Sequence, residues 1–187
     1  MSGARIIAIT PNYSPSATKA DLWILPLEGD RKPMPFLRTD FNEFDGHFSS
    51  DMHWIAYTSD ESGRTEIYVR AFLQASGAAL EAGGKWQVSQ EGGAEPRWRR
   101  DGKELYYRAS DGKVMVVDVT AGTEFRSGTP KLLFQAPPDL LALVQLIPLS
   151  QWDVASDGSR FLISTPAEET TQVPFTVILD WQAGLKK

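Results

Sequence analysis

The chain has 187 residues, of which 42% are hydrophobic and 23% charged, so it is long and apolar enough to bury a core and is not a disordered chain. Its net charge of −5 and isoelectric point near 5.1 argue against binding to nucleic acid or to an anionic membrane surface, because both need a basic surface. It has no cysteine, which excludes disulfides, thiolate metal ligands and cysteine nucleophiles.

Apolar runs in the sequence are too short for a bilayer, which requires roughly 18 to 20 residues. The opening MSGARIIAIT also lacks the basic, apolar and small-residue succession of a signal peptide. We therefore expect no direct insertion into a membrane. The residues themselves leave the compartment open.

Short strands separated by turn residues are expected from the start of the chain. RIIAIT at 5–10 is the first strand, and the Pro- and Ser-rich loop 11–19 follows it. DLWILPL at 21–27 is the second strand, and Gly and Asp at 29–30 make the next turn. Residues 33–39 supply an outer strand.

Two longer segments then predict four strands each, separated by Gly-containing turns. The expected strands are 46–49, 53–58, 65–72 and 85–89 in one segment, and 95–99, 104–109, 113–119 and 130–134 in the other. A last segment predicts strands at 151–155, 160–165 and 174–181.

A hairpin unit recurs along the chain. Setting Asp51 on Asp101 aligns DGHFSSDMHWIAYTS with EPRWRRDGKELYYRA without a gap, and setting Asp157 on Asp101 puts QWDVASDGSRFLIST in the same frame. The Asp is expected to bond its own backbone in the turn, and a following Gly tolerates positive φ. Repeats of this length predict a stacked architecture.

The predicted fold is all-β: a single β-propeller domain of about three and a half four-stranded blades. Its repeat units are expected at approximately 5–39, 40–89, 90–135 and 150–181. A first unit without its inner strand and a last one without its outer strand leave open edges, which favour pairing with another chain. We expect either part of a larger propeller or a homo-oligomer that completes the ring.

One apolar segment, 139–149, interrupts the repeats. LLALVQLIPL is compatible with a helix but is too short to span a membrane. Two interpretations remain open: a loop folded over the blades, or a contact surface for a further domain or partner.

The repeat resembles the TolB-type, WD-like propeller repeat, whose fuller form reads F-S-P-D-G-K-x-I-A-Y. The matching stretches are Phe48-Ser49-Ser50-Asp51, Trp54-Ile55-Ala56-Tyr57, Trp98-Arg99-Arg100-Asp101-Gly102-Lys103 and Ala155-Ser156-Asp157-Gly158. Ser50, Arg100 and Ser156 stand where the family often has Pro. The ending PFTVILDWQAGLKK is similar to the C-termini of bacterial proteins in which such repeats follow a serine/threonine kinase domain. This resemblance implies a sensory or docking module and favours an extracytoplasmic location, with a cytoplasmic one still open.

Motifs for catalysis and cofactors are missing from the sequence. It contains no G-x-S-x-G elbow, and Gly83-Gly84-Lys85 does not complete a phosphate loop because Trp86 follows the Lys. The two histidines, His47 and His53, lie on either side of a turn, which does not suit metal ligation. We expect no enzyme activity in this chain, no cofactor and no metal.

One set of polar residues is a candidate binding site. In a propeller the innermost strand of each blade borders the central channel, so the polar residues six and four positions before each turn Asp are expected at the channel mouth, with Trp152 on its rim. These residues are Asp45, His47, Glu95, Arg97, Gln151, Trp152 and Asp153. Apolar Phe48, Trp98 and Val154 are expected to pack between blades. The set is either a hydrated channel lining or a site for a peptide or small polar ligand.

Two functions follow as expectations. The first is a non-catalytic module that binds a protein, peptide or cell-envelope ligand, as the C-terminal region of a larger bacterial protein such as a membrane-linked serine/threonine kinase. The alternative is the accessory propeller of a prolyl-oligopeptidase-type peptidase or other enzyme.

Overall fold

The fold is that of a computed structural model, which describes residues 6–9, 19–73, 81–136 and 152–164. Within these ranges every regular element is a β-strand and none is a helix. The all-β expectation is therefore confirmed for the described residues. The apolar segment 139–149 and the strand expected at 174–181 lie outside them.

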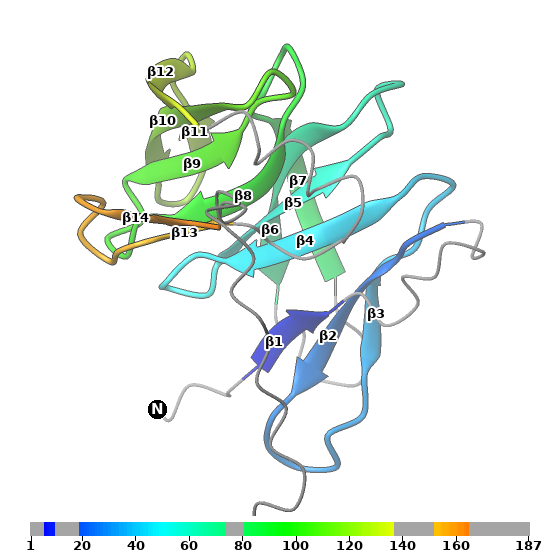
Figure 1. Cartoon of the computed structure of the whole chain (residues 1–187). Coiled ribbons are helices and arrows are strands. Elements are labelled where there is room, and N and C mark those ends of the chain that lie inside the picture. The colour runs from blue at the N-terminus through cyan, green and yellow to red at the C-terminus, as the bar shows by residue number, and fades with distance from the viewer. Residues whose placement is uncertain (1–5, 10–18, 74–80, 137–151, 165–187) are drawn as a thin grey trace, which may run out of the picture.

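Four antiparallel sheets follow one another along the chain (Figure 1). The first contains β1 (Ile6–Ile9), β2 (Leu22–Pro26) and β3 (Met34–Leu37). The second contains β4 (Glu43–Phe48), β5 (Trp54–Ser59), β6 (Glu66–Leu73) and β7 (Glu81–Gln87). The third contains β8 (Ala94–Trp98), β9 (Glu104–Arg108), β10 (Lys113–Ala121), β11 (Phe125–Ser127) and β12 (Lys131–Gln135), and the fourth β13 (Trp152–Val154) and β14 (Phe161–Ile163).

Strand order in the second and third sheets follows chain order, as hairpin connections require. The second sheet runs β4-β5-β6-β7, and the third runs β8-β9-β10 with both β11 and β12 paired to β10. Two features differ from the sequence expectation. β7 begins at Glu81, four residues before the strand expected at 85–89, and β11 was not expected.

Each sheet packs face to face on the next, and a separate hydrophobic core fills each of the three spaces. The first core joins Leu22 and Ile24 of β2 to Ile55 and Tyr57 of β5. The second and third cores are built in the same way from the following residues. The second includes Trp54, Ala56, Ile67, Leu105, Tyr107 and Phe125, and the third includes Tyr106, Val114, Trp152, Phe161 and Ile163. The three apolar residues expected between sheets lie there: Phe48, Trp98 and Val154 pack against the first, second and third core respectively.

Alternation along β9 explains how one strand serves two cores. Leu105 and Tyr107 face the second core, and Tyr106 between them faces the third. Successive side chains of a strand point to opposite faces, so a strand buried on both sides needs an uninterrupted apolar run. The sequence LYY in a Gly-bounded hairpin thus specifies a sheet placed between two others.

The recurring turns have the predicted chemistry. A side-chain oxygen of Asp51 accepts a hydrogen bond from the backbone N–H two residues later at 3.1 Å, and Asp101 and Asp157 each do the same at 3.0 Å. Gly102 and Gly158 have φ of +72° and +75°. Met52 occupies the equivalent position with φ of +62°, a conformation that a side chain makes costly.

Hydrogen bonds to backbone carbonyls also connect the turns of successive sheets. The Ser50 hydroxyl donates to the Arg100 carbonyl, and the Arg100 N–H donates to the Ser156 carbonyl at 3.2 Å. These three residues stand at one repeat position. Proline at Ser50 or Arg100 would remove the donor that this residue supplies, so the absence of Pro from these turns has a structural consequence.

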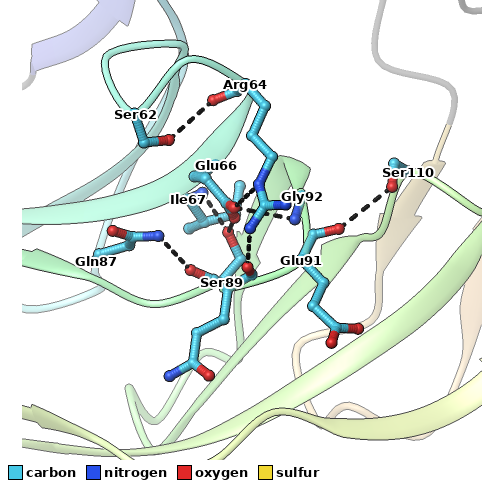
Figure 2. A network of polar contacts seen from close by, with 10 residues as sticks. Ser62, Arg64, Glu66, Ile67, Gln87, Ser89, Glu91, Gly92 and Ser110 are labelled. Carbon is cyan, nitrogen blue, oxygen red and sulfur yellow. Dashed lines mark hydrogen bonds and ion pairs between the residues drawn. The ribbon is translucent and has the colours of Figure 1, made fainter.

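A buried polar network fixes the entry of β8 (Figure 2). The Glu66 carboxylate is fully buried and accepts from Arg64 Nε at 2.7 Å, from Gly92 N at 3.0 Å and from the Ser89 hydroxyl. The bonds from Ser89 and Gly92 join the start of β6 to the residues just before β8, so the network positions the strand that carries Arg97.

Candidate functional site

The candidate site is formed by the first strands of three successive sheets, β4, β8 and β13. β4 lies beside β8, and β1 of the first sheet lies beside β4. Residues at the same repeat position on these strands, His47, Arg97 and Asp153, are brought together. Their proximity follows from the packing of each sheet on the next with the same register of its hairpin.

Backbone bulges shape β4 and β8 just before these side chains. The pairing register shifts between Phe44 and His47 in β4 and between Ala94 and Arg97 in β8. Asp45 and Glu95, at equivalent positions in the bulges, have φ of +52° and +56°. A bulge redirects the residues that follow it, here His47 and Arg97.

Polar contacts link the three equivalent residues in a chain. Arg97 Nη1 lies 2.7 Å from His47 Nε2, and Arg97 Nε lies 3.8 Å from Asp153 Oδ1. Arg97 Nη1 also donates to the Pro96 carbonyl at 2.7 Å. Because a guanidinium can only donate, His47 Nε2 is the acceptor and its ring carries its proton on Nδ1.

An open cavity of about 710 Å³ lies against this chain of contacts. Aromatic and aliphatic side chains form most of its wall, and His47, Arg97, Asp153 and Ser164 supply the charged or polar groups. The lining residues are His47, Phe48, Arg97, Trp98, Trp152, Asp153, Leu162, Ile163 and Ser164. This volume and mixed lining suit a ligand of the size of a short peptide segment.

Trp152 lines the cavity, but it is a buried wall and not an exposed rim. Its exposure is only 3%, because the Arg97 guanidinium lies 5.8 Å from one ring centroid and Phe161 stacks on it with centroids 6.2 Å apart. The prediction that Trp152 lies on the rim of the channel mouth was wrong, because these two neighbours bury its ring. Phe161 belongs to the next strand of the hairpin, which the inner-strand pattern does not include.

Glu95 was expected to face a ligand and instead forms an internal ion pair. Its carboxylate accepts from Arg108 Nη2 at 2.7 Å and Nε at 3.2 Å, and both side chains are buried. Neither Glu95 nor Asp45 lines the cavity. Gln151 lies outside the described residues.

Burial changes the acid–base properties of the inner strands. Desolvation raises the pKa of Asp45 to about 6, although the charge of Arg97 opposes this shift. Desolvation, with the nearby Arg97 charge, lowers the pKa of His47 to about 4. His47 is therefore neutral at pH 7, which agrees with its role as the acceptor of the Arg97 hydrogen bond.

Metal binding has no support in the described part of the chain, where no group of three or more His, Asp or Glu side chains is arranged to hold an ion. His53 is exposed and lies 3.2 Å from Asp51, away from His47. No helix among the described residues is long and apolar enough to cross a membrane.

Several lining residues were not anticipated as site residues. Leu162, Ile163 and Ser164 follow the last Asp-Gly turn and enter the cavity because β14 pairs with β13, with Leu162 opposite Asp153. The sequence signal for this position was available: in an antiparallel hairpin, the residue opposite a site residue shares its face.

The fold and the site are those of an all-β protein in which successive antiparallel sheets pack face to face and three of them contribute their first strands to one polar site.

Neither a protein-family model nor a curated protein sequence matches the chain. Among solved structures, the chain is similar to TolB from Acinetobacter baumannii, with 17% sequence identity and a TM-score of 0.35. The match covers 86% of this chain and 46% of that chain, so the chain spans a little under half of that protein's length.

Proposed function

We propose that this chain is a non-catalytic β-propeller module that binds a protein or peptide at the cavity beside His47, Arg97 and Asp153. One observation carries the proposal: residues at one repeat position of three successive sheets meet at a single cavity with an apolar and aromatic wall. In a propeller the inner strands of all blades surround one central channel. Polar groups at the mouth of that channel are suited to bind a ligand.

The finer form of the proposal concerns the whole protein. The four sheets represent about three and a half blades of a ring that either a longer polypeptide or a second copy completes. The sequence resemblance supports a C-terminal module of a membrane-linked bacterial kinase with a cell-envelope ligand. Discovery of an α/β-hydrolase domain on the same polypeptide would instead favour the accessory propeller of a peptidase.

Peptide display followed by NMR tests the binding proposal. Peptides selected on the immobilised chain are expected to shift the indole N–H signals of Trp98 and Trp152, which line the cavity, and to leave that of Trp23 in the first sheet unchanged. Selected peptides that shift neither cavity signal would contradict the proposal.

A pair of histidine variants supplies the control. His47→Ala removes a cavity residue and is expected to weaken peptide binding, while His53→Ala changes an exposed side chain beyond the hairpin turn and is expected to leave it unchanged. Equal affinities for both variants would place the peptide elsewhere.

A further inference from the structure

The exposed face of the fourth sheet has the sequence character of a face that is buried in the other sheets. Ala56, Tyr106 and Leu162 occupy the same position of the repeat. Ala56 is 0% exposed and Tyr106 2% exposed, because the next sheet covers each of them, whereas Leu162 is 75% exposed. A large aliphatic side chain at this position is therefore placed for packing against another sheet.

Asp153, the charged residue beside Leu162, also occupies a repeat position that contacts the next sheet in the earlier sheets. His47 contacts Arg97 of the next sheet, and Arg97 contacts Asp153 of the sheet after that. Asp153 is the cross-strand partner of Leu162, and its side chain is 70% exposed. This face thus presents an apolar group next to a carboxylate, and its complement is an apolar group next to a cation.

A surface of that kind lies at the opposite end of the stack. On β2, Leu22 and Ile24 face the first core, so Trp23 between them points away from it. The Arg38 guanidinium lies 5.9 Å from the Trp23 ring centroid, and its side chain is 63% exposed, with its Nε donating a hydrogen bond to Asp21 Oδ2 at 3.3 Å. This outward face of the first sheet therefore carries an aromatic ring next to an exposed cation that is paired with one carboxylate.

We infer that the Leu162–Asp153 face of one copy packs on the Trp23–Arg38 face of a second copy, in a head-to-tail contact that continues the stack of sheets. Leu162 packs against the half-buried Trp23 ring, and Arg38 lies opposite Asp153. Because Leu162 and Asp153 also line the cavity, this contact and peptide binding at that wall exclude one another. The two surfaces differ, so the contact is heterologous and leads to a closed ring or to an open chain of copies.

Sedimentation velocity over a range of protein concentrations, with the full chain, tests this contact. We expect concentration-dependent association that Leu162→Glu weakens by about tenfold or more, because the variant places a charge in an apolar contact. Leu132→Glu is the matched control: Leu132 is 56% exposed on β12, outside both faces, and its change is expected to leave association unchanged.

Charge exchange gives a second, independent readout. Asp153→Arg and Arg38→Asp are each expected to weaken self-association, and a mixture of the two variants is expected to restore it, since each then supplies the complement that the other lacks. A chain that stays monomeric at every concentration would overturn the inference. Equal effects of the Leu162 and Leu132 variants, or a mixture that associates no better than either variant alone, would overturn it too.

Discussion

His47 Nε2 accepts a hydrogen bond from Arg97 Nη1 at 2.7 Å, and the two residues stand at the same repeat position of neighbouring sheets, 50 residues apart. Such a contact between equivalent residues requires the first strands of the two sheets, β4 and β8, to lie side by side. Asp153 extends the same relationship to a third sheet. The polar site is thus a consequence of the repeat, and substitutions at it are expected to affect both packing and binding.

The pH dependence of folding stability is expected to contain two opposing contributions from β4. Asp45 has a folded pKa of about 6, above its ordinary value, so its contribution favours the folded state at low pH and is lost as pH rises from about 4 to 6. His47 has a folded pKa of about 4, below its ordinary value, so its contribution is present above about pH 6.5 and is lost as pH falls towards 4.

Variants separate the two contributions. Relative to the unchanged chain, Asp45→Asn is expected to become more stable against unfolding as pH rises from 4 to 7, and His47→Gln is expected to become less stable. The changes are at most about 3 kcal/mol for Asp45 and about 3.5 kcal/mol for His47, since one pKa unit corresponds to about 1.4 kcal/mol. Urea unfolding at several pH values measures both curves. Slopes of the same sign would refute the assignment of these two groups.

Substitutions at equivalent turn positions in two sheets, Met52 and Gly102, are expected to change the stability of the fold in opposite directions. Met52→Gly relieves a side chain held at φ of +62° and is expected to stabilise the fold by about 0.5–1 kcal/mol. Gly102→Ala introduces a side chain at φ of +72° and is expected to destabilise it by about 1 kcal/mol, although a Cβ there meets no atom within 4 Å. Thermal unfolding measures both. Destabilisation by Met52→Gly would show that burial of the Met side chain outweighs the backbone strain.

The turn contact between the third and fourth sheets is tested by Arg100→Pro. Arg100 is the second residue of a turn closed by the Gly102 N–H and the Arg99 carbonyl, a position that favours Pro, so the variant keeps the turn and loses only the donor to Ser156. We expect hydrogen exchange in β13 and β14 to become about fivefold faster, as for the loss of a hydrogen bond worth about 1 kcal/mol.

Arg100→Ala keeps the backbone donor and serves as the control for that experiment. Its exchange in β13 and β14 is expected to match that of the unchanged chain. A similar acceleration in both variants would assign the effect to the Arg100 side chain.

The internal ion pair between Glu95 and Arg108 is expected to matter more for stability than exposed pairs do. Arg108→Met removes a guanidinium from a carboxylate that is 4% exposed, and this is expected to cost about 3 kcal/mol. Arg126→Met breaks the exposed pair with Glu124 and is expected to cost less than about 1 kcal/mol. Urea unfolding compares them, and equal losses would contradict the difference in burial as the cause.

Much of the fold follows from local sequence patterns. The Asp-Gly turns specify where hairpins reverse, because their φ values and side-chain bonds are local, and the apolar runs on β5 and β9 suit strands that are buried on both faces. The gapless alignment also predicts that His47 and Arg97 occupy equivalent places. β11 was missed because its three residues have no alternation of their own and are held by pairing with the end of β10.

The outcome for individual site residues depended on partners that no short-range pattern reveals. Glu95 is buried because Arg108 lies beside it on β9, a register effect of the bulge at Glu95 itself. Trp152 is buried where Phe161 stacks on its ring and the Arg97 guanidinium lies over it. The repeat alignment places Glu95 and Trp152 on the first strands of their sheets, but only packing between strands and sheets decides which of them face the cavity.

Site-specific fluorescence tests the proposed binding cavity most directly, because the chain has no cysteine and a single one introduced by mutation carries the only label. An environment-sensitive dye on Ser164→Cys lies at the cavity, and the same dye on Ser127→Cys lies on β11, outside it. Peptides selected on the chain are expected to change the emission of the first label with saturation and to leave the second unchanged. Saturable binding that changes only the label at position 127, or both labels equally, would contradict a binding site beside His47, Arg97 and Asp153.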